Sequence, residues 1–279
     1  MRARRLLEGS GHGSERSLFR GDGVELAEIR PYQPGDDYRS IDWNVTARAG
    51  RPHVKRMEEE RELPLLLAVD ASGSLEFGTG ERTKRELAAE VAAVLGLAAL
   101  REGHPVGDFL FTDRLEGGVV APSRSRDRFR GLTARLASPV RGDGTDLAGA
   151  LRAANALTDR RSVVTVVTDL VEPGSFGGEL DRLRRRHDVL FVEVRDPADD
   201  RLPDVGLLPV RDPESGRIGM ADLASARVRD RFARGAGVER ERAHRELERQ
   251  GVDRISVRTD QEYATDLAAL FRARDRRRR

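Results

Sequence analysis

Apolar residues gather in short runs that are spaced along the chain at intervals typical of strands. Three runs, residues 63–69, 162–168 and 189–194, are apolar at nearly every position. Strands that are covered on both faces have this continuous pattern, whereas half-exposed strands alternate. Shorter strand-like segments are expected at 106–111, 118–121 and 254–257. The pattern predicts a sheet whose central strands are buried on both sides.

Segments with helical spacing separate these strands. Thr83 and Glu86 match a capping box, so a helix is expected to begin after Thr83 and to end near Gly103. Further helices are expected near residues 125–137, 145–158, 176–187 and 260–273. Strands that alternate with helices form a parallel sheet covered on both faces. We therefore expect a doubly wound, mostly parallel α/β fold with its ligand site at the carboxyl ends of the strands.

Other segments flank or interrupt this pattern. Residues 1–60 are polar and rich in glycine, yet contain the single tryptophan, so we expect an arm that packs on the main domain, residues 61–273. Residues 205–222 are predicted to form a β-hairpin insertion. A charged helix or pair of helices follows, for which we expect an interruption at 235–237. Residues 274–279 form a basic tail, which we interpret as a disordered end and not as a nucleic-acid arm.

Composition narrows the class of protein. Charged residues make up 35% of the chain, cysteine is absent, and the formal net charge is only +2, which gives little support for nucleic-acid binding. No apolar run approaches the roughly 18 residues needed to span a bilayer. The first residues carry positive charge without an apolar segment behind them, unlike a signal peptide. We expect a cytoplasmic protein without membrane insertion.

Oxygen-bearing side chains follow two of the predicted core strands. Asp70, Ser72 and Ser74 alternate along the loop after the first strand, and Asp169 follows the strand at 162–168. Thr145 lies at a predicted helix start, and we expect it, too, on a loop after a strand. Each has an ordinary alternative: Asp and Ser are turn residues, and Thr145 could be a helix N-cap.

Taken together, these residues are more specific. If the loops meet at one sheet edge, they offer carboxylate and hydroxyl oxygens without His or Cys, a set that suits Mg²⁺ or Mn²⁺ and not Zn²⁺. Few carboxylates with neutral hydroxyls would leave such an ion able to accept a further carboxylate from outside. The predicted metal ligands, and predicted partner-binding residues, are therefore Asp70, Ser72, Ser74, Thr145 and Asp169.

This set resembles the metal-ion-dependent adhesion site of von Willebrand factor A domains. The resemblance implies that the hydroxyls bind the metal, that the aspartates act directly or through water, and that a partner's Glu or Asp completes the shell. The chain is also similar to the bacterial family known as domain of unknown function 58. Matching segments are residues 25–43, 46–48, 52–55, 196–197, 202–206 and 212–216.

The family resemblance spans about residues 9–273 and departs from the family pattern at Leu26 and Leu75, neither of which is a predicted ligand. Many relatives carry transmembrane helices upstream, and this sequence does not, so the resemblance implies the soluble short form of the family. It also implies a MoxR-type AAA+ ATPase as partner. The expected function is therefore a metal-dependent adaptor in complex assembly or maturation, and not an enzyme.

A Mg-dependent phosphohydrolase with Asp70 as nucleophile is the main alternative. Such an enzyme needs a second acid two residues later, where this chain has Ser72. Residues 78–84 lack the ending of a phosphate-binding loop, and the histidines show no metal-ligand spacing. The charges of the arm, such as Arg30 and Asp36, could form a second site, but we interpret them as an ion-pair and turn network that fixes the arm on the α/β domain. Glu193, inside a core strand, is expected to have an arginine partner.

Overall fold

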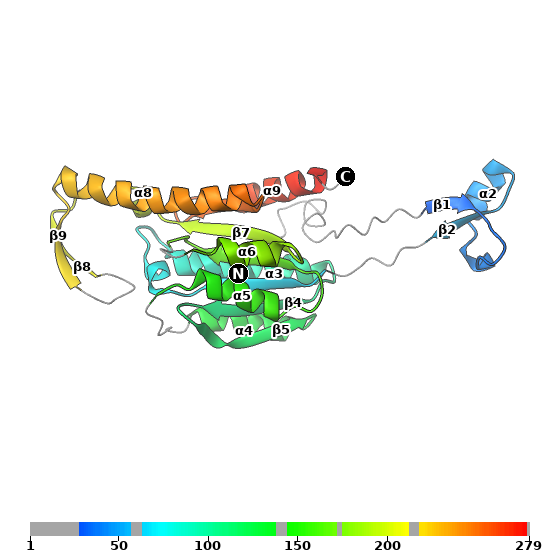
Figure 1. Cartoon of the computed structure of the whole chain (residues 1–279), viewed down its shortest axis with the longest axis horizontal. Coiled ribbons are helices and arrows are strands. Elements are labelled where there is room, and N and C mark those ends of the chain that lie inside the picture. The colour runs from blue at the N-terminus through cyan, green and yellow to red at the C-terminus, as the bar shows by residue number, and fades with distance from the viewer. Residues whose placement is uncertain (1–27, 57–62, 138–143, 172–174, 212–217, 278–279) are drawn as a thin grey trace.

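A six-stranded sheet forms the centre of the main domain (Figure 1). The computed structural model describes residues 28–56, 63–137, 144–171, 175–211 and 218–277. In spatial order the strands are β10 (Asp253–Arg258), β7 (Asp188–Arg195), β6 (Val163–Thr168), β3 (Leu65–Asp70), β4 (Val106–Phe111) and β5 (Leu115–Ser123). All neighbours are parallel except β4 and β5. The predicted α/β fold class is confirmed.

The strand order reverses direction between β3 and β6. From β3 the chain proceeds outward through β4 to β5, and it then returns to the other side of β3 with β6, β7 and β10. Crevices for ligands open at such a switch point, outside the carboxyl ends of the two strands. Asp70 ends β3 and Thr168 ends β6, so both flank this point.

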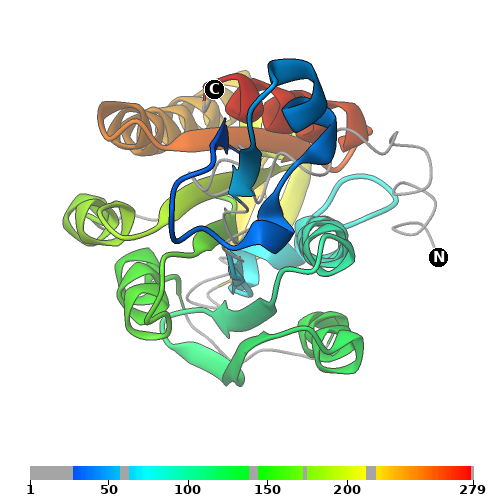
Figure 2. The ribbon, with the colours of Figure 1, turned by 90° about the vertical axis from the view of Figure 1, so that its right-hand side faces the viewer.

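Helices cover both faces of the sheet (Figure 2). One layer consists of α3 (Lys84–Arg101), α4 (Arg126–Ala137) and α9 (Ala264–Arg277). The other consists of α5 (Leu147–Ala156), α6 (Gly177–Arg184) and α8 (Ala226–Arg249). Short helices follow β3 and β7 at the sheet edge, namely η2 (Gly73–Glu76) and α7 (Pro197–Asp200).

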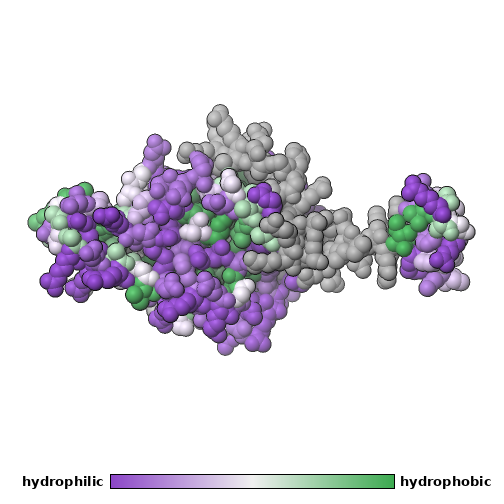
Figure 3. All heavy atoms as spheres, turned by 90° about the horizontal axis from the view of Figure 1, so that it is seen from above, coloured by the Kyte–Doolittle hydropathy of each residue, from purple (hydrophilic) through white to green (hydrophobic). Residues whose placement is uncertain are grey.

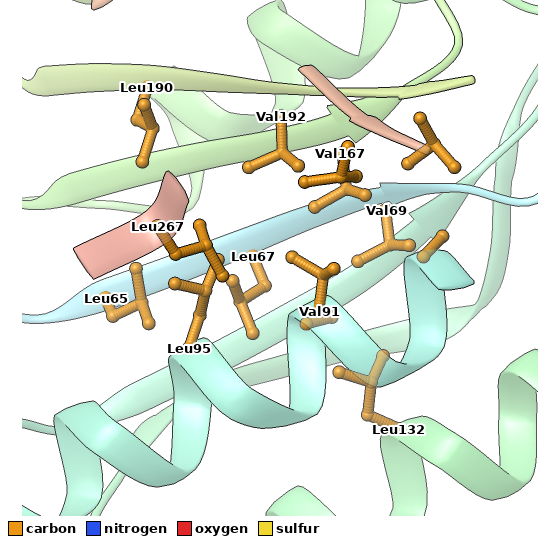
Figure 4. Packing of buried hydrophobic residues seen from close by; sticks show 14 of the residues in the cluster. Leu65, Leu67, Val69, Val91, Leu95, Leu132, Val167, Leu190, Val192 and Leu267 are labelled. Atoms are coloured by element: carbon orange, nitrogen blue, oxygen red, sulfur yellow. The ribbon is translucent and has the colours of Figure 1, made fainter. Parts of the chain in front are cut away.

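The alternation of side chains along β3 explains its continuous apolar sequence. Leu65, Leu67 and Val69 point into the core that α3 closes with Val91 and Leu95 (Figure 4). The residues between them, Leu66 and Ala68, point into the opposite core. Successive side chains of a strand face opposite sides, so a strand between two helix layers needs apolar residues at every position.

Two local details fix α3. Its capping box is present as predicted: Glu86 N donates to Thr83 Oγ1 over 3.1 Å, and Thr83 N donates to Glu86 Oε2 over 2.8 Å. Gly96, in the middle of the helix, lies against the ring of Phe129 from α4, and a β-carbon there would clash with that ring. The glycine therefore permits the close approach of α3 and α4.

The described part of the arm is a small separate unit. β1 (Glu28–Pro31) pairs antiparallel with β2 (His53–Arg56), and η1 (Tyr38–Ser40) and α2 (Trp43–Ala49) lie between them. Arg30 binds Asp36 over 2.6 Å, and Asp42 caps α2, so these charges form ion-pair and turn contacts inside the unit, and their predicted role in fixing the arm on the α/β domain stays a prediction. Figure 1 draws the unit apart from the α/β domain, and packing of residues 1–60 on that domain stays a prediction.

The predicted hairpin is present. β8 (Leu207–Arg211) pairs antiparallel with β9 (Ile218–Asp222), and the predicted turn lies largely outside the described residues. Residues 274–277 of the predicted tail continue α9, because the buried Arg274 guanidinium pairs with Asp188 and Asp253. Among the described helices, none combines the length and the apolar character needed to cross a bilayer.

The predicted interruption at residues 235–237 is wrong. α8 is one helix of 24 residues that passes through Gly235 and Gly237. A glycine costs a helix about 1 kcal/mol relative to alanine, which weakens the helix without breaking it. The carboxyl-terminal half of α8 is held in the core by Ala243 and Leu247, so the segment remains helical.

Candidate metal and partner site

The loop after β3 brings three predicted ligands together. Asp70 and Ser72 are fully buried and Ser74 is nearly so. Ser72 N donates to Asp70 Oδ1 over 2.8 Å, which closes the turn, and the hydroxyls of Ser72 and Ser74 lie 3.0 Å apart. One carboxylate and two hydroxyls therefore converge at the end of the strand, as the alternating sequence predicts.

Asp70 also bridges the switch point. Thr168 Oγ1, at the end of β6, donates to Asp70 Oδ2 over 2.7 Å. Burial, and next the negative charge of Asp169, raise the pKa of Asp70 to about 7. The hydrogen bonds to Asp70 come from Ser72 N and Thr168 Oγ1, and a carboxyl group held in this way is stabilised in its charged form by an added cation.

Asp169 follows β6 in a strained turn. Its Oδ1 accepts from Val171 N over 3.2 Å, so Asp169 does have the turn role that the sequence indicates as its ordinary alternative. The next residue, Leu170, has a φ of 57°, and it is the sole non-glycine residue with a positive φ within the described ranges. Leu170 N donates to Thr168 Oγ1 over 3.2 Å, and its side chain is buried in the core. Residues held in strained backbone conformations cluster at functional sites.

Thr145 differs from its predicted setting in two ways. It precedes α5 and follows α4 in the chain, and so does not lie on a loop after a strand. It is also not the N-cap, because Asp146 takes that role by accepting from Gly149 N over 2.7 Å. As a result Thr145 Oγ1 is buried and has no hydrogen-bond partner among the residues that the structure describes. A buried hydroxyl without a partner is unfavourable unless a ligand satisfies it.

Backbone hydrogen bonds bring Thr145 to the same sheet edge. Ala71 N donates to Phe111 O at the end of β4 over 2.8 Å. Thr112 is the first residue of the loop after β4, and its backbone carbonyl accepts from Asp146 N over 2.7 Å. The start of α5 is therefore tied to the loop beside Asp70, which brings Thr145 to the edge where Asp169 also lies.

Lys84 belongs to this edge, although sequence reasoning did not assign it there. It begins α3, is almost fully buried, and its Nζ donates to Asp169 Oδ2 over 2.8 Å and to Asp199 Oδ1 over 3.1 Å. Burial lowers the pKa of Lys84, but the charges of Asp169 and Asp199 outweigh this and leave the pKa above its ordinary value. A positive charge in the first turn of a helix is unfavourable next to the helix dipole. The position of Lys84 directly after the Thr83 cap was therefore the one signal in the sequence that this lysine has an acidic partner.

Two further acidic residues hold neighbouring segments together beside the site. Asp196 caps α7 and accepts from Thr79 Oγ1 over 2.8 Å and from Thr259 Oγ1 over 2.6 Å. Glu193, buried in β7, accepts from Arg254 Nη1 over 2.8 Å and contacts His244 Nε2 at 3.1 Å. The arginine partner expected for Glu193 is confirmed, and both carboxylates have structural roles beside the site.

The oxygen atoms at this edge are the kind of ligand that hard metal ions prefer. In the part of the chain that the structure describes, no group of three or more His, Cys, Asp or Glu side chains is arranged to hold a metal. A metal at this edge would therefore have mixed ligands, two carboxylates and three hydroxyls, which suits Mg²⁺ or Mn²⁺. The unpartnered Thr145 hydroxyl and the buried Asp70 fit such an ion.

The sheet order, the single antiparallel edge strand and the loop motif at the switch point define a von Willebrand factor A-like domain. The chain belongs to the family described as protein of unknown function DUF58, whose model matches residues 28–242. Uncharacterized proteins of Mycobacterium bovis and Mycobacterium tuberculosis are 36% identical over 272 residues, covering 97% of this chain and 86% of theirs.

Solved structures resemble the chain more distantly. The conserved hypothetical protein BatB from Bacteroides thetaiotaomicron is 16% identical, with a TM-score of 0.47 and coverage of 77% of this chain and 99% of its own. The SpRpn10 VWA domain is 12% identical, with a TM-score of 0.43 and coverage of 74% and 93%. Scores of this size do not carry a function across.

Proposed function

We propose that this protein is a metal-dependent adaptor that binds a partner protein at the switch-point edge. Asp70, Ser72, Ser74, Thr145 and Asp169 would hold one Mg²⁺ or Mn²⁺, and the partner would be a MoxR-type AAA+ ATPase in the cytoplasm, acting in complex assembly or maturation. The observation that carries the proposal is the Thr145 hydroxyl, which is buried without a hydrogen-bond partner among the described residues. Its alternative role as helix cap is taken by Asp146.

The bound ion would supply a positive charge that can take up a carboxylate oxygen from another protein. Three of the five ligands are neutral hydroxyls, and the charge of Asp169 is shared with Lys84. This donor set neutralises a divalent ion only in part, so we expect weak binding by the isolated protein. A partner's Glu or Asp would complete the neutralisation. Metal and partner should therefore increase each other's affinity by the same factor.

No observation on the described residues favours the alternative, a Mg-dependent phosphohydrolase with Asp70 as nucleophile. Both carboxylate oxygens of Asp70 accept hydrogen bonds, one from Ser72 N and one from Thr168 Oγ1. The position two residues later is a serine, which is a poor proton donor for a leaving group. A phosphoesterase activity that is lost in Asp70→Asn and retained in Ser72→Ala would favour the enzyme.

The test of the adaptor function is a binding titration of a MoxR-type ATPase from the same bacterium. Wild type and Asp70→Ala are each titrated with Mg²⁺ and with EDTA, and Asp113→Ala, an exposed aspartate after β4, serves as a control at the same edge. We expect strong binding only for wild type and the control in Mg²⁺. Equal affinity in all conditions would show that the partner does not dock through this site.

A further inference from the structure

α8 is longer than the domain that supports it. Its buried residues, Ala243 and Leu247, both lie in its second half. The first half, from Ala226 to about Glu239, extends beyond the edge of the sheet, and the β8–β9 hairpin hangs from that end (Figure 1). Apolar side chains, drawn in green, are visible at this end of the molecule in Figure 3.

The apolar face of α8 does not stop where the domain stops. Val228, Phe232 and Ala236 are spaced by four residues, and they continue the face that Ala243 and Leu247 bury in the core. Phe232 nevertheless remains 43% exposed and Val228 is also exposed. The sequence therefore places core-type residues on a stretch of helix that has no core beneath it.

The hairpin has the same character. Its register places Leu207, Pro209, Met220 and Ile218 on one face, and Leu208 and Val210 on the other. Ile218 is 74% and Met220 63% exposed, and the residues of the second face are exposed as well. A two-stranded hairpin is only marginally stable by itself, and apolar residues on both faces require a covering partner.

This end of the molecule belongs to the edge that carries the candidate metal site. The hairpin follows α7, whose Asp199 pairs with Lys84 and thus lies one side chain away from Asp169. Arg240, in the middle of α8, donates to Asp200 Oδ1 of the same short helix over 2.7 Å. The overhanging helix and the hairpin are therefore anchored beside the metal ligands.

We propose that the hairpin–helix end, defined by Leu207, Ile218, Met220, Val228 and Phe232, is a second contact surface for the partner whose carboxylate completes the metal site. This inference rests on the proposed function. The partner segment should combine apolar side chains with carboxylates, because the exposed cations Arg227, Arg231 and Arg234 outnumber the exposed acids Asp230 and Glu239 on the same half-helix.

A protein partner fits this end better than a membrane surface does. The neighbouring oxygen site requires a carboxylate ligand, which a protein segment supplies together with apolar side chains. A partner that contacts both places would gain the specificity of the metal and the apolar area of the hairpin.

The experiment is a titration of the MoxR-type ATPase against full-length variants in Mg²⁺ and in EDTA. One variant combines Ile218→Ser with Met220→Ser, and another is Phe232→Ser. Val238→Ser is the matched control, since Val238 is 63% exposed on the same half-helix but lies off the apolar face. In Mg²⁺ we expect Kd to rise at least about tenfold for the hairpin variant and for Phe232→Ser, with the control unchanged. Circular dichroism checks that all variants fold.

The outcomes separate the two proposals. Wild-type affinity of the hairpin variant or of Phe232→Ser, together with lost binding by Asp70→Ala, overturns the second surface and leaves the metal site intact. Weakened binding by both variants without any effect of Asp70→Ala or EDTA overturns the metal site and supports the surface. The surface is also overturned if the wild type does not bind the ATPase. The variants are also tested for binding to phosphatidylserine vesicles and, by analytical ultracentrifugation, for self-association. If the substitutions weaken either of these, the surface belongs to a membrane or to a second copy of the chain, and the proposal is overturned.

Discussion

Lys84 Nζ lies 2.8 Å from Asp169 Oδ2, and both side chains are almost fully buried, with 3% and 1% exposed. The two residues join the start of α3 to the end of β6 across the switch point. The lysine thus provides a permanent positive charge next to the place where the metal ion is proposed to bind. This pairing makes the stability of the fold dependent on the same carboxylate that the proposed function uses.

Replacing Lys84 with methionine should make stability depend on divalent ions. The substitution leaves the buried Asp169 without its cation, and breaking a buried pair costs about 3–5 kcal/mol of the free energy of unfolding. Mg²⁺ should restore part of this loss, because the ion would neutralise the released carboxylate. Urea unfolding with and without Mg²⁺ measures the effect, with Asp199→Asn as the control that keeps the Lys84–Asp169 pair. An equal response of wild type and Lys84→Met to Mg²⁺ would contradict the proposed site.

Thr145→Val should separate binding from folding. The Thr145 hydroxyl has no partner in the described structure, so its removal should leave stability unchanged or raise it by up to about 1 kcal/mol. Mn²⁺ binding, followed by electron paramagnetic resonance, should weaken. Thr168→Val is the comparison, since its hydroxyl donates to Asp70, and its loss should lower the free energy of unfolding by about 1–3 kcal/mol. A Thr145→Val variant as unstable as Thr168→Val would indicate that the hydroxyl is structural.

His187 should make the protein less stable in mild acid. Its Nε2 lies 3.2 Å from Thr158 Oγ1, which donates to Ala154 O, an arrangement that favours the proton on Nε2. Nδ1 has no partner among the described residues. Burial, and then the charge of Arg186, lower the pKa of His187 from 6.5 to about 4.

The sign of the pH effect follows from this lowered pKa. Below about pH 6.5 the unfolded chain takes up a proton that the folded protein excludes until about pH 4. The stability that the neutral ring contributes is complete above pH 6.5 and is lost as the pH falls toward 4, by up to about 3 kcal/mol. Chemical unfolding from pH 7 to 4 should show a loss in wild type that is smaller by this amount in His187→Gln. Parallel curves would show that the histidine is already protonated or free to ionise.

Alanine should have opposite effects at two helical glycines. At Gly96 the new β-carbon would clash with Phe129, and overpacking of this kind costs about 1–3 kcal/mol. At Gly235 nothing lies within 4 Å of the added atom, and alanine should stabilise α8 by up to about 1 kcal/mol. Thermal unfolding of the two variants measures both signs, and Phe129→Leu should relieve the Gly96→Ala defect. Stabilisation by Gly96→Ala would contradict the packing of α3 on α4.

The strands and most helices could be predicted because their signals are local. The apolar run at residues 63–69 and the capping box at Thr83 act within a few residues, so they do not depend on the rest of the fold. The continuity of α8 could not be predicted in this way. Its glycines oppose the helix locally, whereas Leu247 contributes a contact in the core that the sequence does not reveal.

In the candidate site, too, local features could be predicted from the sequence and long-range contacts could not. The spacing of Asp70, Ser72 and Ser74 predicts their convergence, because all of them lie on one loop. Lys84 pairs with a residue 85 positions away, so only the packing of α3 against the sheet brings the two together. The choice of Asp146 over Thr145 as N-cap was also open, since adjacent Asp and Thr residues are both good caps.

Leu170 has a wider consequence for how this edge meets a ligand. A leucine with φ of 57° carries backbone strain of about 1–2 kcal/mol that a glycine would remove. The leucine side chain is buried in the core, which fixes the turn and with it the direction of the Asp169 carboxylate. The loop is therefore shaped when the chain folds and not when a ligand arrives. The entropy needed to order the Asp169 carboxylate is thus lost during folding, and under the proposed function a partner would meet an oxygen that is already in place.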